Sequence, residues 1–297
     1  MHSPVIQKRL KLSILFTALI LVAETVGGVV ANSLALLSDA AHMFGDVFSL
    51  SLSWFALKIA SQPFTDTKTY GYHRMEIFAA FINGVLLLAM AAMIFFEALE
   101  RFQNPGEVNS LLVLGVATLG LVTNMGVLYF LKDSAMHSHD LNVKSAFFHV
   151  VGDALASIAV ILGAIVMWVT GWYTLDILLS IAISGLLLFG AWNILSDAVH
   201  ILLEGVPKGI SISEVEKELT SIPAIKNVHE LHVWSICSNI YALSTHALVN
   251  DQKVQQAEAV LNEAQNLLKE KFNITHSTIQ FESSPCQQAD ALCEMKH

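Results

Sequence analysis

Two pairs of histidine and aspartate, each spaced four residues apart, lie inside long apolar segments of the chain. His42 and Asp46 form one pair and His149 and Asp153 the other, each in the pattern His-x-x-Gly-Asp. Residues at i and i+4 project from the same face of a helix. A charge at the bilayer centre costs roughly 3 kcal/mol or more, so apolar spans normally exclude such residues. If the two helices face each other, two imidazoles and two carboxylates surround one point and form a four-ligand metal site.

The mixed nitrogen and oxygen ligand set indicates which metals suit this site. Zn²⁺ accepts such a tetrahedral set, with Co²⁺ and Cd²⁺ as competitors. Mg²⁺ prefers oxygen ligands alone. A haem site would not need the aspartates, and the His-Glu-x-x-His pattern of an intramembrane metalloprotease is absent from the sequence. The alternative is that each of these polar residues only forms a hydrogen bond to a neighbouring helix. This explanation would suit a single His or Asp better than it suits two matching motifs.

The composition identifies the elements that must position these residues. The chain is 54% hydrophobic and 14% charged, which is too apolar for an ordinary soluble protein of 297 residues. After residue 205 the sequence becomes mixed and polar, so we expect a transmembrane domain over 1–207 and a soluble domain over 208–297. About 20 apolar residues cross a bilayer. Six segments meet this length: 10–31, 33–58, 75–100, 108–131, 145–170 and 174–203.

Basic residues in the loops predict the orientation in the membrane. Eight Lys and Arg residues lie on the side that carries the amino terminus, against Arg101 alone on the opposite side. Loops rich in Lys and Arg stay in the cytoplasm, so we expect both termini there. The soluble domain has no basic patch of the kind that binds nucleic acid.

The soluble domain combines helical and strand patterns. Apolar residues recur at helical spacing in 213–222 and 252–271, and alternate as in strands in 228–236, 241–249 and 274–282. The order αββαβ predicts a small ferredoxin-like α+β domain. The expected fold is therefore an α-helical membrane protein with six transmembrane helices and a cytoplasmic α+β domain.

A second group of metal-ligand residues lies in the predicted sheet. If the hairpin turns around Asn239, His232 and His246 lie directly opposite each other, with Cβ atoms about 5 Å apart. Glu282, at the end of the third strand, is a candidate third ligand. Cys286 and Cys293 follow with a spacing wider than a C-x-x-C motif, and an odd cysteine count in a reducing compartment favours free thiols or metal ligands. The alternative is a set of polar residues on a half-exposed sheet.

The chain resembles the cation diffusion facilitator family of zinc-exporting transporters. The resemblance spans nearly the whole chain, and its paired His and Asp motif is highly specific. It is carried by the segments Ser33–Asp46, Tyr70–Arg74, Phe147–Asp153, Leu202–Pro207 and Leu231–Trp234.

The resemblance implies a proton-coupled Zn²⁺ exporter, not an enzyme, that works as a homodimer in the lipid bilayer. It implies that His42, Asp46, His149 and Asp153 form the transport site, and that two His with two Asp favour zinc. The short loop with His137 and His139 and the lack of a targeting extension suggest the inner membrane of a bacterium. For the soluble domain, it implies dimerisation and metal sensing. The zinc ligands implied there are His232, His246 and Glu282, completed by Cys286, Cys293 or His2 of the partner subunit.

Some interpretations stay open at this point. A zinc sensor would bind metal without turnover. A channel would need weak or multiple binding sites, whereas a single four-ligand site would hold Zn²⁺ too tightly for conduction. Asp39 either guides ions towards the site or caps the start of its helix, and Asp176 is expected to lie near a helix end in contact with water. Arg74 is expected to pair with Glu204, where the membrane and soluble domains join.

Overall fold

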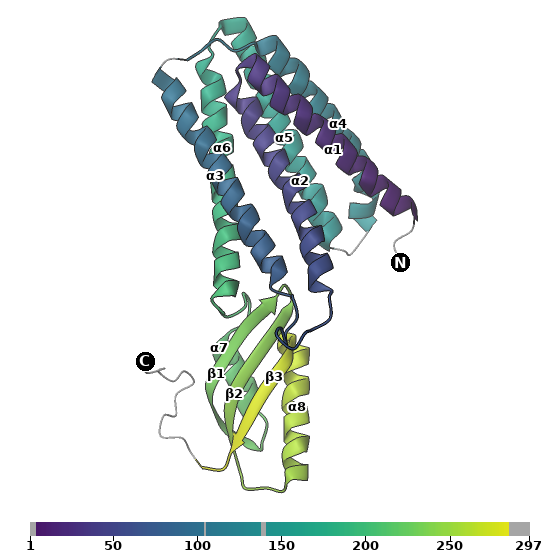
Figure 1. The fold of residues 1–297 in the computed structure, drawn as a ribbon, viewed down its shortest axis with the longest axis vertical. Helices are drawn as coiled ribbons and strands as arrows, with labels where there is room; N and C mark the ends of the chain where they lie inside the picture. Colours follow the sequence, from purple (N-terminus) through teal and green to yellow (C-terminus); the bar gives the residue numbers. More distant parts are fainter. Residues whose placement is uncertain (1–3, 104, 138–140, 285–297) are drawn as a thin grey trace. The chain divides into compact units, whose positions relative to one another are not determined.

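Six long helices precede residue 203 within the described part of the chain (Figure 1). The computed structural model describes the backbone of residues 4–103, 105–137 and 141–284, and the side chains of residues 18–49, 51–52, 55–56, 58–103, 105–129 and 150–284. A helix occurs at each of the six predicted apolar segments. The helices are α1 (Pro4–Ala31), α2 (Leu34–Ala60), α3 (Met75–Gln103), α4 (Ser110–His137), α5 (Leu141–Thr170) and α6 (Thr174–Leu202).

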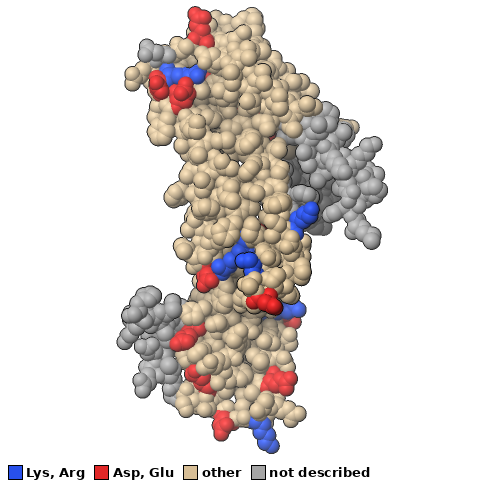
Figure 2. Space-filling model, in the orientation of Figure 1, with Lys and Arg blue, Asp and Glu red and all other residues tan. Residues whose placement is uncertain are grey.

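Four of these helices are long and apolar enough, over their described residues, to cross a membrane. They are α3, the Ser110–Tyr129 part of α4, the Val150–Thr170 part of α5, and α6. Large apolar side chains such as Met93, Val169 and Leu186 are exposed on their outer faces, as expected where lipid is the solvent. On the face drawn in Figure 2, the sides of the helices are almost free of charged residues. The structure therefore agrees with a helical transmembrane domain.

The chain divides into two compact units, each described here by itself. One contains Met1–Leu52 and Ile82–Leu195, and the other contains Ser53–Phe81 and Ser196–His297. In the first unit, α1, α2, α4 and α5 share a buried cluster around Leu36, Val113 and Met167. A smaller cluster joins α2, α3 and α6 through Leu34, Ala98 and Ile177 (residues of α2, α3 and α6 in turn).

The second unit contains a three-stranded sheet in the predicted order αββαβ. Strand β2 lies between the other two, antiparallel to β1 and parallel to β3. Helices α7 and α8 contact each other and share one apolar core with the sheet, so both cover the same face (Figure 1). The elements are α7 (Ile212–Thr220), β1 (Ile225–Cys237), β2 (Ile240–Val249), α8 (Val254–Phe272) and β3 (Ile274–Glu282).

Candidate metal centres

Helix α2 presents the first His and Asp pair side by side. His42 Nδ1 lies 3.0 Å from Asp46 Oδ2, as the i, i+4 spacing predicts. Both side chains are partly accessible, at 34% and 33% of their maximum. A metal ion can therefore reach this pair, and its imidazole and carboxylate are ligands that Zn²⁺ accepts.

Helix α5 brings a third ligand to the same point. One ligand atom from each of His42, Asp46 and Asp153 lies within 4.8 Å of the others, a spacing that one ion can bridge. His149 lies on α5 four residues before Asp153, but its side chain is outside the described residues. The structure thus brings together three of the four predicted transport-site residues, from helices that are about one hundred residues apart in the sequence.

The two motif glycines have different surroundings. A Cβ atom on Gly45 would lie 2.2 Å from Leu87 Cδ2 on α3, so the missing side chain allows α3 to approach the ligand pair closely. A Cβ on Gly152 would meet no described atom within 4 Å. Among the residues that the structure describes, it is therefore the glycine of the first motif that permits close helix packing.

Two further acidic residues are buried near these ligands along α1 and α2. Asp39 is the sixth residue of α2, so of the two alternatives the one in which it caps the helix start is wrong. Glu24 on α1 is 1% exposed, and its Oε2 atom makes no hydrogen bond within the described part of the chain.

Asp176, in the first turn of α6, was expected to contact water and is instead 2% exposed.

The C-terminal sheet holds a second cluster of metal-ligand residues. His246 Nδ1 lies 2.9 Å from Glu282 Oε1, and His229 Nε2 lies 3.3 Å from Glu282 Oε2. The ligand atoms of these three residues lie within 4.8 Å of one another. His229 is 2% exposed and its Nε2 makes no hydrogen bond among the described residues. A buried nitrogen without a hydrogen bond costs free energy, and a metal ion between these groups would remove that cost.

The predicted register of the hairpin is wrong. His246 lies opposite His229, and His232 lies opposite Ser244. The turn occupies Ser238 and Asn239, and the register shifts by one residue between Ser235 and Cys237 and again between His229 and His232, where Glu230 has a φ of 48°. A bulge adds a residue to one strand and re-aims the following side chains. Alternation along the sequence contains no sign of such an insertion, so the predicted register placed His232 and not His229 opposite His246.

The other predicted ligands of the C-terminal domain have separate outcomes. His232 is exposed and does not join the cluster. Cys286 and Cys293 lie outside the described residues. Glu230, which was not predicted as a ligand, lies with its Oε2 atom 3.4 Å from His246 Nε2. The alternating pattern of the strand gave no signal that favoured His229 over His232.

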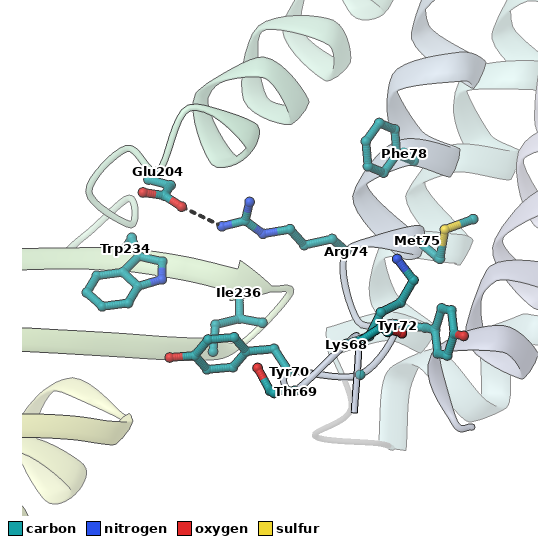
Figure 3. Close-up of a pocket in the computed structure, with 12 residues that line it drawn as sticks. Lys68, Thr69, Tyr70, Tyr72, Arg74, Met75, Phe78, Glu204, Trp234 and Ile236 are labelled. Atoms are coloured by element: carbon teal, nitrogen blue, oxygen red, sulfur yellow. Dashed lines mark hydrogen bonds and ion pairs between the residues drawn. The ribbon is translucent and has the colours of Figure 1, made fainter. Parts of the chain in front are cut away.

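The predicted contact between Arg74 and Glu204 is confirmed. Arg74 Nη2 lies 2.9 Å from Glu204 Oε1, and Figure 3 shows the two side chains reaching towards each other. They line a cavity of about 560 Å³ together with aromatic residues that include Tyr70 and Trp234. The pair therefore ties the segment before α3 to the segment after α6 within the second unit.

Comparison with known proteins assigns both parts of the chain. The family model described as the cation efflux transmembrane domain matches residues 10–203, and the model described as the cation efflux protein cytoplasmic domain matches residues 207–284.

Full-length relatives agree with these matches. The chain is 41% identical to the metal cation efflux system protein CzcD of Cupriavidus metallidurans, covering 96% of this chain and 89% of that protein. It is 38% identical to the cadmium, cobalt and zinc/H⁺-K⁺ antiporter of Bacillus subtilis, covering 98% and 94%. It is 36% identical to the zinc transporter ZitB of Escherichia coli, covering 92% and 87%. A solved structure of the metal-bound C-terminal domain of CzcD is 40% identical and covers 25% of this chain and 99% of its own, with a TM-score of 0.23.

Proposed function

Because this chain belongs to the cation efflux family, we propose that it exports Zn²⁺, and also Cd²⁺ or Co²⁺, in exchange for protons. It is a multi-pass membrane transporter of metal cations and not an enzyme. The observation that carries the proposal is the approach of His42, Asp46 and Asp153 from two helices. His149 is the fourth proposed ligand. The names of relatives, which include zinc, cadmium and cobalt as substrates, support this choice of metals.

The proposed ligand set fits the charge of the transported ion. Two aspartates bring two negative charges, so a bound dication leaves the loaded site close to neutral. A neutral site is cheaper to keep within a bilayer than an unbalanced charge. Two imidazoles complete the tetrahedral coordination that zinc prefers.

The same ligands couple metal to protons. Metal binding requires the ligands to lose protons, and imidazole changes charge in the pH range where membranes maintain gradients. Zn²⁺ entering from the cytoplasm therefore displaces protons, and protons entering from the other side displace Zn²⁺. Alternating access around one site near the midplane performs the exchange. The antiporter name of the Bacillus subtilis relative supports proton coupling.

The proposed arrangement has six membrane crossings, with both termini in the cytoplasm of a bacterial inner membrane. Residues 1–207 form the transport domain, and residues 208–297 form a ferredoxin-like cytoplasmic domain that joins two copies into a homodimer. The loop distribution of Lys and Arg supports this orientation.

The cytoplasmic domain carries a regulatory zinc site in this proposal. His229, His246 and Glu282 are its ligands, because their atoms lie close enough to share one ion. Cys286, Cys293 or His2 of the partner subunit is proposed to complete it. Zinc bound there would report the cytoplasmic concentration to the transport domain.

The proposed regulatory site also supports a second candidate function, that of a zinc sensor. A sensor binds zinc stoichiometrically, whereas a transporter turns over. The deciding measurement is Zn²⁺ uptake into proteoliposomes with an imposed pH gradient, for wild type, Asp153→Ala and the exposed control Asp251→Ala. Sustained uptake in wild type and the control, absent from Asp153→Ala, supports export. Stoichiometric binding without uptake in any of the three would establish the sensor instead.

A further inference from the structure

A buried carboxylate joins the start of α2 to α6. Asp176, in the first turn of α6, accepts a hydrogen bond from the Ser33 hydroxyl at Oδ1 (2.5 Å) and one from the Leu34 amide at Oδ2 (2.7 Å). The Ala35 amide lies 3.4 Å from the same Oδ2 atom. Asp176 thus takes up backbone donors that the first turn of a helix leaves without partners.

The surrounding donors offset part of the cost of burying the Asp176 carboxylate. The positive end of the α2 macrodipole and three donors face the carboxylate. Ser33 completes the cap, because its hydroxyl oxygen accepts a hydrogen bond from the Leu36 amide (3.2 Å). If the start of α2 separates from α6, the Asp176 carboxylate loses these donors and needs water in their place. The contact therefore favours the closed arrangement until water can enter.

The turn between α1 and α2 is held from two other directions. Arg101 of α3 donates to Asn32 Oδ1 (2.7 Å), and Asn32 donates from Nδ2 to the Glu107 carbonyl (3.1 Å). The Asn109 amide donates to the Ala31 carbonyl (3.0 Å). This end of the helical unit is therefore closed by polar contacts from α3, the segment before α4, and α6.

Packing differs between the two halves of α2. Leu34, Ala35 and Leu36 are buried, with exposures of 3%, 0% and 0%. His42 and Asp46, two to three turns further along, are about one third exposed. Asp176 lies at the start of α6, and the C-terminal domain follows the end of α6 in the sequence. In the proposed topology, the buried end is therefore the one remote from the cytoplasm. The metal ligands are accessible, and the remote end of α2 is shut.

We propose that Asp176 and Ser33 form a latch that closes the remote end of the transport site and must open for metal to leave. The proposal rests on the proposed export function and deepens it by naming what controls release. Closed, the latch holds the conformation that faces the cytoplasm. Open, it lets the first turns of α2 separate from α6 and admits water and protons to the ligands.

The test locks this end without changing the latch. Leu34 and Ile177 belong to the same buried cluster, so Leu34→Cys with Ile177→Cys is joined by a short cleavable thiol cross-linker, after Cys286 and Cys293 are replaced by Ser. We expect the cross-linked protein to bind zinc as wild type does and to lose at least tenfold of its uptake rate, with recovery on reduction. A cross-link between Val113→Cys and Ala164→Cys, which share a cluster between α4 and α5, is the matched control and should leave uptake unchanged.

If the cross-linked protein takes up zinc as fast as the same variant after the cross-link is cleaved, transport does not require this end to open. That result would overturn the latch. If the reduced double variant is itself inactive, Ser33→Ala decides. Losing one latch bond should reduce the inward-facing fraction and raise the KM for zinc up to about fivefold, with kcat unchanged. A lower kcat with unchanged KM would mean a static anchor. Absence of uptake in wild type would refute the export function itself and not the latch.

Discussion

His246 on β2 lies directly opposite His229 on β1, and their imidazole rings meet edge to face with centroids 5.2 Å apart. Glu282 of the neighbouring strand contacts both rings. Three strands therefore contribute one candidate ligand each, at a spacing that one zinc ion could bridge. A site built on strands changes its geometry only if the strands move, so a metal ion bound there would stiffen the C-terminal domain.

Replacing His229 should remove the cytoplasmic site, and replacing His232 should not. The full-length Asp153→Ala variant serves as the background, so that zinc binding at the transport site is weakened. Losing a residue that only hydrogen-bonds to a metal ligand costs roughly 10- to 100-fold in affinity, and we expect His229→Ala, which removes a ligand itself, to cost more. His232→Ala is the matched control because His232 is exposed and outside the cluster. Titration calorimetry measures both variants. Equal loss in the two variants would contradict the observed register as the basis of the site.

The two motif glycines should respond differently to alanine. Gly45→Ala places a methyl group 2.2 Å from Leu87 Cδ2 and forces that side chain to move, which typically costs about 1–3 kcal/mol. Gly152→Ala meets no atom of the described residues within 4 Å and should stabilise α5 by up to about 1 kcal/mol. Thermal unfolding in detergent, with uptake measured alongside, tests the pair. If both variants unfold at the same temperature, α2 and α3 do not approach each other as described.

The pair of Arg74 and Glu204 should matter for transport more than for stability. Its side chains are 40% and 62% exposed, so solvent screens the attraction and the pair contributes at most about 1 kcal/mol. Arg74→Glu should slow uptake by uncoupling the segment before α3 from the segment after α6, and the double variant with Glu204→Arg should restore it. Uptake rates of the two single variants and the double variant form a mutant cycle. Independent, additive losses would show that the contact has no role in transport.

Cys237 should react slowly with thiol reagents. Burial, followed by the nearby charge of Glu76, raises the pKa of the Cys237 thiol, so the reactive thiolate forms only at a higher pH than usual. With Cys286 and Cys293 replaced by Ser, we expect alkylation at pH 7.5 to be at least tenfold slower than at an exposed thiol and to accelerate as the pH rises. Ser238→Cys in a Cys237→Ser background supplies the exposed control. Equal rates at neutral pH would mean that the thiol is accessible and its pKa ordinary.

Several features were predictable because they depend on local spacing. The i, i+4 placement of His42 and Asp46 on one helix face follows from 3.6 residues per turn. The six helices follow from apolar runs of membrane length, and the αββαβ order follows from the switch between helical and alternating patterns. The contact between Arg74 and Glu204 was expected from the resemblance to a known family and was found.

Other features depend on how distant segments meet, and local spacing carries no information about them. His229 lies opposite His246, three residues before the predicted His232. The turn at Ser238 and Asn239 and two register shifts, between Ser235 and Cys237 and between His229 and His232, each displace the pairing by one residue. Asp176 was predicted to lie near a helix end in contact with water. In the structure it is buried and accepts hydrogen bonds from Ser33 and Leu34 at the start of α2.

The sequence alone determined which residues are candidate zinc ligands and that each His and Asp pair shares one helix face, because ligand chemistry and helical periodicity are local properties. The approach of Asp153 to His42 and Asp46 and the choice of His229 over His232 were decided only by the tertiary structure. Each requires segments far apart in the chain to meet at distances of a few ångströms, and packing and strand register set those distances.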